Sequence, residues 1–222
     1  MIHLVQARDA LVALLDLGGW VVGVILALSV LSGAVVLWKL VQFHMAGVGQ
    51  HTAVMAGLAA WDAGRGPQAC GLADGAPSHL GPIFAMAMRG GTAMRERTYA
   101  LAEARLARLE WGFRLLDTVA QTAPLLGLFG TVLGMIDAFR AMQAAGQDVD
   151  PSVLAGGIWV ALMTTAAGLA VAMPVSVILS WFEARVAAER RMAEVLIEGA
   201  LAPGALRADP GTGAVLTEAV HA

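Results

Sequence analysis

The sequence predicts an all-α membrane protein with three transmembrane helices, of which the second and third extend into the cytoplasm. Composition is one reason: of 222 residues, 58% are hydrophobic and 14% are charged, whereas about 25% of the residues in a soluble domain are charged. The distribution of charge is another, because residues 17–38, 118–136 and 151–182 include no Asp, Glu, Lys or Arg. Roughly 20 apolar residues cross a bilayer as a helix. The 26 glycines are typical of membrane helices that pack closely.

The first transmembrane helix is expected over residues 17–39, after a short N-terminal segment, residues 1–16. A cleaved signal peptide is the alternative, with an apolar core of about 7–15 residues behind a basic cluster. The uncharged run here has 22 residues, and Arg8, Asp9 and Asp16 precede it. A retained helix explains this pattern better.

The basic residues predict the orientation of the chain. Arg8 alone precedes the first helix, and Arg140 alone lies between the second and the third. The other twelve of the 14 Lys and Arg residues lie between the first two helices or after the third. Because Lys and Arg accumulate on the cytoplasmic side, we expect the N-terminus outside and the C-terminus in the cytoplasm.

The second membrane helix is expected to begin well before the membrane. Leu106, Leu109, Phe113 and Leu116 recur at helical spacing ahead of the second uncharged window, which is the pattern of an amphipathic helix. The sequence therefore predicts one long helix over residues 92–139. Its transmembrane part is expected at about residues 118–138.

The third membrane helix has recognisable start and stop signals. Asp150 followed by Pro151 is typical of an N-cap and a first helical turn, and Pro203 with Gly204 ends the pattern. We expect a helix over residues 151–201, with its transmembrane part at about 152–182. The remaining segments are expected to be a cytoplasmic loop at 40–91 with short helices around 52–63 and 82–89, an outer loop at 140–150, and a flexible cytoplasmic tail at 202–222.

Small residues share one face on each of the last two membrane helices, which predicts close helix packing. They are Gly127, Gly130, Gly134, Gly157, Ala161 and Gly168. Thr131 and Thr165 lie on the same faces, and Thr164 precedes the latter. A threonine hydroxyl in a membrane helix can bond back to its own helix, or it can offer a donor and two acceptors to a neighbouring helix or to water. Both interpretations stay open for these threonines.

The interiors of the predicted spans hold no ionisable side chain, and Asp137 lies only at the outer end of the second. Proton relays need such groups inside the membrane, so a partner helix would have to supply one. The five histidines have no metal-ligand spacing, and the sequence has no phosphate-binding loop and no activated nucleophile. We therefore expect no enzyme, cofactor or metal, and the net charge of −3 does not favour nucleic acid as a partner.

The segments TAPLLGLFGTVLGMIDAF (122–139) and LAGGIWVALMTTAAGLAVAMP (154–174) together resemble the ExbB/TolQ/MotA proton-channel family, and within it ExbB. The resemblance implies a pentamer in the inner membrane of a Gram-negative bacterium, with the N-terminus and the 140–150 loop in the periplasm. Its pore would enclose an ExbD-like single-span partner that carries an intramembrane Asp. Proton flow would then energise a TonB-like protein for outer-membrane uptake. A TolQ-like stator of the Tol-Pal envelope system and a structural scaffold without proton conduction are the alternatives.

The same resemblance assigns individual residues. Thr131 and Thr165 match the pore-lining threonines of the family, with Thr164 beside them. The departure is Val160, because family members commonly have a Glu five residues before the second threonine, in a GIxEAL context, where this chain has GIWVAL. Either that Glu is not needed for proton passage, or this chain uses another route or a weaker drive.

Overall fold

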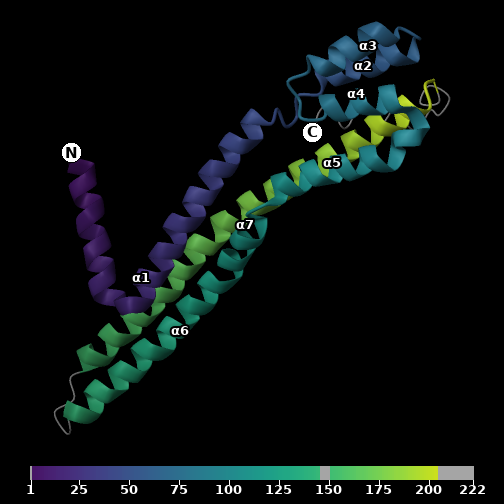
Figure 1. Ribbon diagram of the computed structural model, residues 1–222. Coiled ribbons are helices and arrows are strands. Elements are labelled where there is room, and N and C mark those ends of the chain that lie inside the picture. The colour runs from purple at the N-terminus through teal and green to yellow at the C-terminus, as the bar shows by residue number, and fades with distance from the viewer. Residues whose placement is uncertain (1, 146–150, 205–222) are drawn as a thin grey trace. The chain divides into compact units, whose positions relative to one another are not determined.

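The computed structural model describes residues 2–145 and 151–204, and describes side chains from residue 19 onward apart from residues 145, 151 and 153. All regular structure in these residues is helical (Figure 1). The helices are α1 (Ile2–Met45), α2 (Thr52–Asp62), α3 (Gly66–Asp74), α4 (Gly81–Gly90), the short 3-10 helix η1 (Gly91–Met94), α5 (Arg95–Glu110), α6 (Phe113–Ala145) and α7 (Pro151–Leu201).

Three stretches of helix are long and apolar enough to cross a membrane, within Gly19–Met45, Gly81–Ala144 and Leu154–Leu201. The predicted class, an all-α membrane protein with three spans, is confirmed. Exposed apolar side chains accompany these stretches, as expected where lipid replaces water around a helix. Examples are Leu125, Leu162, Met173 and Val177.

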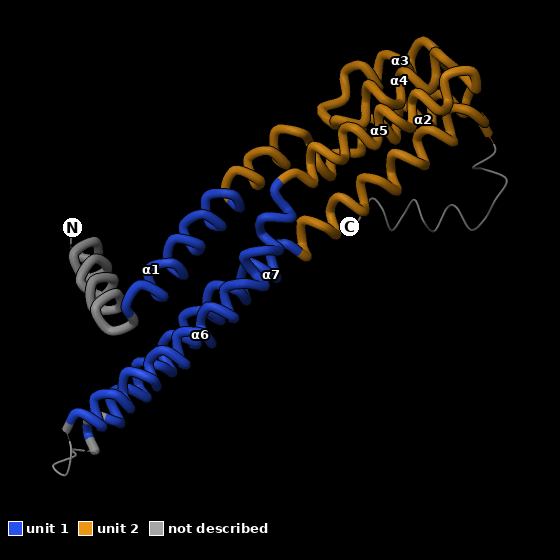
Figure 2. Tube along the Cα trace, turned by 60° about the horizontal axis from the view of Figure 1, so that its bottom comes forward, with its two compact units in different colours: residues 1–36, 112–179 blue, residues 37–111, 180–222 orange. Residues whose placement is uncertain are grey.

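The chain divides into two compact units (Figure 2). The first comprises residues 1–36 and 112–179, and the second comprises residues 37–111 and 180–222. The uncharged windows fall almost wholly in the first unit. In that unit α6 and the first part of α7 run side by side in both views.

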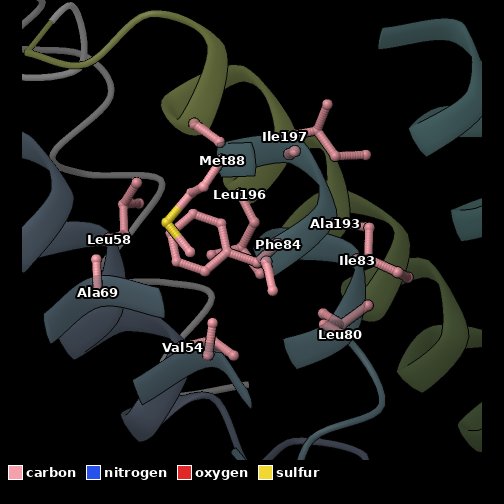
Figure 3. Close-up of a cluster of buried hydrophobic side chains, with 14 of the residues drawn as sticks. Val54, Leu58, Ala69, Leu80, Ile83, Phe84, Met88, Ala193, Leu196 and Ile197 are labelled. Carbon is pink, nitrogen blue, oxygen red and sulfur yellow. The ribbon is translucent and has the colours of Figure 1, made fainter. Parts of the chain in front are cut away.

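The second unit has a hydrophobic core of its own (Figure 3). Side chains of α2, α3 and α4 meet those of the last turns of α7 around the fully buried Phe84. The core includes Val54, Leu58, Ala69, Leu80, Ile83, Met88, Ala193, Leu196 and Ile197. The indole Nε1 of Trp61 donates to the Ala200 carbonyl at 3.0 Å, which fixes α2 against the end of α7.

The expected helix over 92–139 is divided in the structure. Residues 91–94 form η1, α5 ends at Glu110, and α6 begins at Phe113. Gly112 separates the two helices with φ = 91°, a left-handed conformation that a continuous α-helix does not contain and that glycine adopts without strain. The apolar residues on both sides of Gly112 keep helical spacing, so their pattern does not predict this break.

The other segments follow the expected bounds more closely. α7 has the expected limits of 151 and 201, whereas α3 was not anticipated and α6 continues to Ala145, into the expected 140–150 loop. α1 has a non-helical Gly19 with φ = 60°, inside the window expected to be one helix. Asp150 and residues 205–222, most of the expected flexible tail, lie outside the described residues.

Candidate functional site

The backbones of α6 and α7 touch where the small residues lie. A Cβ added to Gly127 would be 2.9 Å from the Thr164 carbonyl oxygen and 2.9 Å from the Thr165 Cα. A Cβ added to Gly134 would be 3.1 Å from the Cβ of Ala161. Both positions exclude a larger side chain unless the helices move apart, which is the packing role that small residues have in membrane helices.

The remaining small residues extend this contact along both helices. Gly130 faces the Thr164 side chain, Gly157 faces Ala138, and Gly168 faces the carbonyl of Ala123. All six residues predicted to serve helix packing are thus placed at one α6–α7 contact. The contact continues over several turns, so it fixes the rotation of each helix about its own axis.

Thr164 belongs to this contact. The residue is 2% exposed, and its hydroxyl donates to the Ala161 carbonyl at 2.7 Å on its own helix. The Gly127 carbonyl of α6 is 3.2 Å from the same hydroxyl oxygen. Thr164 therefore joins the two helices, and its hydrogen-bonding capacity as a donor is used within the pair.

Thr165 differs from its neighbour. Its Oγ1 is buried and has no hydrogen-bond partner among the described residues. A buried hydroxyl without a partner is costly and uncommon in native proteins. The Thr165 Cα lies against Gly127, so this residue belongs to the close α6–α7 contact.

Thr131 lies one helical turn after Gly127 on α6 and is partly buried. Its hydroxyl donates to the Leu128 carbonyl at 2.7 Å on its own helix. The hydrogen-bond donor of Thr131 is therefore used within α6, which is one of the two expected arrangements. The oxygen retains acceptor capacity. Of the three threonines, Thr165 alone offers a buried hydroxyl without a hydrogen bond within the described residues.

The segments that carry these hydroxyls, residues 118–136 and 151–182, contain no charged side chain. Val160, in place of the carboxylate that the resemblance implied, is a partly buried aliphatic residue of α7. Asp137 is exposed at the far end of α6 and lies 3.9 Å from Arg140. No group of His, Cys, Asp and Glu able to hold a metal ion occurs among the described residues.

Sequence reasoning missed a second polar cluster, in the second unit. The carboxylate of Glu189 is 1% exposed and lies 3.2 Å from His51 Nε2 and 3.6 Å from His79 Nε2. The spacing of the histidines does not predict this cluster, because 138 positions separate His51 from Glu189 in the sequence. No local motif signals such a long-range arrangement.

A protein-family model, the MotA/TolQ/ExbB proton channel family, matches residues 77–195, more than half of the chain. Over 63 residues the chain is 51% identical to the biopolymer transport protein exbB1 of Vibrio cholerae, covering 28% of each protein. It is 42% identical over 69 residues to the biopolymer transport protein ExbB of Neisseria gonorrhoeae, 31% of each. It is 41% identical over 78 residues to the Tol-Pal system protein TolQ of Pseudomonas aeruginosa, 35% of this chain and 33% of that protein.

The matches to these relatives therefore cover about a third of their length or less. The family model covers α4 to α7 almost completely, including both threonine-bearing helices. The family is one of proton channels rather than enzymes, and with the three apolar helices it makes this chain a multi-pass inner-membrane protein. The chain belongs to the MotA/TolQ/ExbB proton channel family.

Proposed function

We propose that this chain is an ExbB-like stator subunit that uses the proton-motive force to drive motion of a partner. In this proposal, copies of the chain, five in number, surround an ExbD-like single-span helix that carries an Asp inside the membrane. The motion energises a TonB-like protein for outer-membrane uptake. The N-terminus lies in the periplasm and the C-terminus in the cytoplasm, consistent with the distribution of Lys and Arg.

The observation that carries the proposal is the buried Thr165 hydroxyl without a hydrogen-bond partner among the described residues. An Asp that enters the membrane on a partner helix is costly unless it finds a hydrogen bond or an opposite charge. The windows around Thr165 contain no basic residue, so a hydroxyl donor is what α7 can offer. Thr131 would offer an acceptor oxygen when that Asp is protonated.

The close α6–α7 contact supports the same role. The Thr164 carbonyl oxygen and the Thr165 Cα lie against Gly127, so the helix contact holds the α7 backbone at Thr165 in place. A donor held in place costs little reorganisation when charge arrives. The partner Asp could then lose and regain its proton beside a fixed group of this chain.

Thr165→Val tests the proposal, because valine has nearly the same volume and no hydroxyl. We expect loss of energy-dependent uptake, measured as accumulation of an iron chelate, while the variant still copurifies with the single-span partner. Thr122→Val is the matched control, since its hydroxyl bonds the Thr118 carbonyl at 2.7 Å on the exposed side of α6. Normal uptake in Thr165→Val, with Thr165→Ser behaving no differently, would contradict the role given to this hydroxyl.

A TolQ-like stator of the Tol-Pal system is the second candidate, and the match to TolQ of Pseudomonas aeruginosa favours it. The two roles separate in a deletion strain. Loss of iron-chelate uptake with an intact envelope supports the ExbB-like role, whereas detergent sensitivity with intact uptake supports the TolQ-like role. A structural scaffold is the third candidate, and Val160 in place of a carboxylate favours it.

A further inference from the structure

Glu189 of α7 is the centre of a buried polar cluster in the second unit. Its Oε1 accepts a hydrogen bond from the Gly49 backbone N–H at 2.6 Å and lies 3.2 Å from His51 Nε2. Its Oε2 lies 3.6 Å from His79 Nε2. We call Gly49, His51, His79 and Glu189 the histidine–glutamate cluster.

The cluster holds two loops to α7. One is the segment 46–51 that follows α1, and the other is the segment 75–80 that precedes α4. The backbone N–H of His79 donates to the Ala46 carbonyl at 3.0 Å. Gly47, with φ = 63°, lies so close to the Pro77 carbonyl that a Cβ there would collide with it. The loops therefore pack directly on each other, and the contacts of Glu189 hold both of them against α7.

The hydrogen bonds of the two imidazoles are incomplete. Nδ1 of His51, both ring nitrogens of His79 and Oε2 of Glu189 are buried and have no hydrogen-bond partner among the described residues. A buried polar group without a partner is costly, and water would supply partners to these groups if the loop opened. For His79, burial also disfavours the charged imidazolium relative to the neutral ring. Proton uptake by His79 is therefore unfavourable while the cluster stays closed.

The charges that face His79 come from three elements. Glu189 approaches from α7, His51 from the first loop, and Arg105 from α5, where its Nη1 donates to the His79 carbonyl at 2.6 Å. Arg190, which follows Glu189 on α7, pairs with Glu103 and Glu110 of α5. Burial lowers the pKa of His79 from its ordinary 6.5, Glu189 and the nearby Ala46 backbone raise it in part, and Arg105 and His51 lower it further.

We propose that the histidine–glutamate cluster is a proton-binding regulatory site that releases the loop 46–51 from Glu189 when the pH around the second unit falls. The open loop exposes the imidazole of His79 to water, where it binds a proton more strongly than in the closed cluster. Protons therefore favour the open form by linkage. The sign is fixed by the direction of the His79 pKa: the closed form is complete above 6.5 and is lost as the pH falls below that value.

Hydrogen–deuterium exchange of the full-length protein in lipid nanodiscs tests this. Exchange of a peptide covering residues 46–51 is compared at about pH 7.5 and about pH 5.5, after correction for the intrinsic pH dependence of exchange. We expect protection to fall at the lower pH, by up to about tenfold per pH unit for each proton taken up. A peptide covering residues 192–200, in the core of the same unit, is expected to keep its protection.

The variants distinguish a pH response that comes from the cluster from a general effect of low pH on the protein. His79→Gln should abolish the pH-dependent loss of protection. His44→Gln, at an exposed histidine near the same loop, should leave it unchanged. Glu189→Gln keeps an acceptor for Gly49 and removes the attraction that favours protonated His79, so the loss at about pH 5.5 should be larger than in the unmodified protein.

Three results would overturn the proposal. The first is protection of residues 46–51 that does not change with pH. The second is a pH response that persists in His79→Gln while the 192–200 peptide stays protected, because another group would then be responsible. The third is a response that disappears when a chelator is added, because a bound metal and not a proton would then control the loop.

Discussion

Gly127 and Thr165 lie against each other at the α6–α7 contact. The glycine lets the α7 backbone approach closely, and the Thr165 hydroxyl is buried without a hydrogen-bond partner among the described residues. Thr164 occupies the adjacent position and satisfies its donor within the helix pair. Thr164 therefore serves helix packing, whereas the Thr165 hydroxyl has no hydrogen bond within the described residues, although both are threonines in the same turn.

Gly127→Ala tests the contact at this scale. The added methyl group would lie 2.9 Å from the Thr164 carbonyl oxygen, so we expect a loss of about 1–3 kcal/mol, the usual cost of overpacking. Gly156→Ala is the matched control on α7, because a Cβ there meets nothing within 4 Å. Stability is measured by unfolding the detergent-solubilised protein in increasing denaturant. Equal midpoints for the two variants would contradict the close contact.

The helices illustrate which elements the sequence could predict. Pro151 at the start of α7 and Pro203 with Gly204 after its end are local signals, and the limits of 151 and 201 agree with them. The break between α5 and α6 has a weaker signal, a single Gly112 inside an unbroken helical pattern. Glycine is tolerated within helices at about 1 kcal/mol, so its presence alone does not predict that a helix ends.

Gly112 also makes the break testable. Its φ of 91° is a conformation that costs L-residues roughly 1–2 kcal/mol, and β-branched residues adopt it least readily. We expect Gly112→Val to lower the denaturation midpoint clearly, and Gly112→Asn to lower it much less, because Asn accepts this conformation. A Gly112→Val variant as stable as the unmodified protein would mean that α5 and α6 can join as one helix.

At the scale of the whole molecule, the candidate sites differ in how far the sequence could reveal them. The threonines of α6 and α7 fall within contiguous segments, so spacing and family resemblance pointed to them. The histidine–glutamate cluster assembles three distant parts of the chain, residues 49–51, His79 and Glu189. Only the folding of the second unit brings these parts together, so a single sequence does not predict that they lie close to each other.

Proton conduction by the assembled protein is the corresponding prediction. In proteoliposomes with an imposed pH gradient, we expect no proton leak from this chain alone, because its uncharged windows hold no titratable group. Addition of the single-span partner should produce a leak, and replacement of the partner's Asp by Asn should remove it. Absence of any partner-dependent leak would favour the scaffold, and a leak through this chain alone would contradict the proposed division of roles.

The three uncharged windows also determine how the protein responds to membrane voltage. An electric field does work only on charge that moves through it, about 2.3 kcal/mol for one elementary charge across 100 mV. Residues 118–136 and 151–182 carry no charged side chain, so a shift of α6 or α7 along the field would transfer almost no charge from these segments. Voltage alone would leave these helices where they are. Any electrical work would have to be done on a charge from outside these windows, and the helix pair would respond to it mechanically.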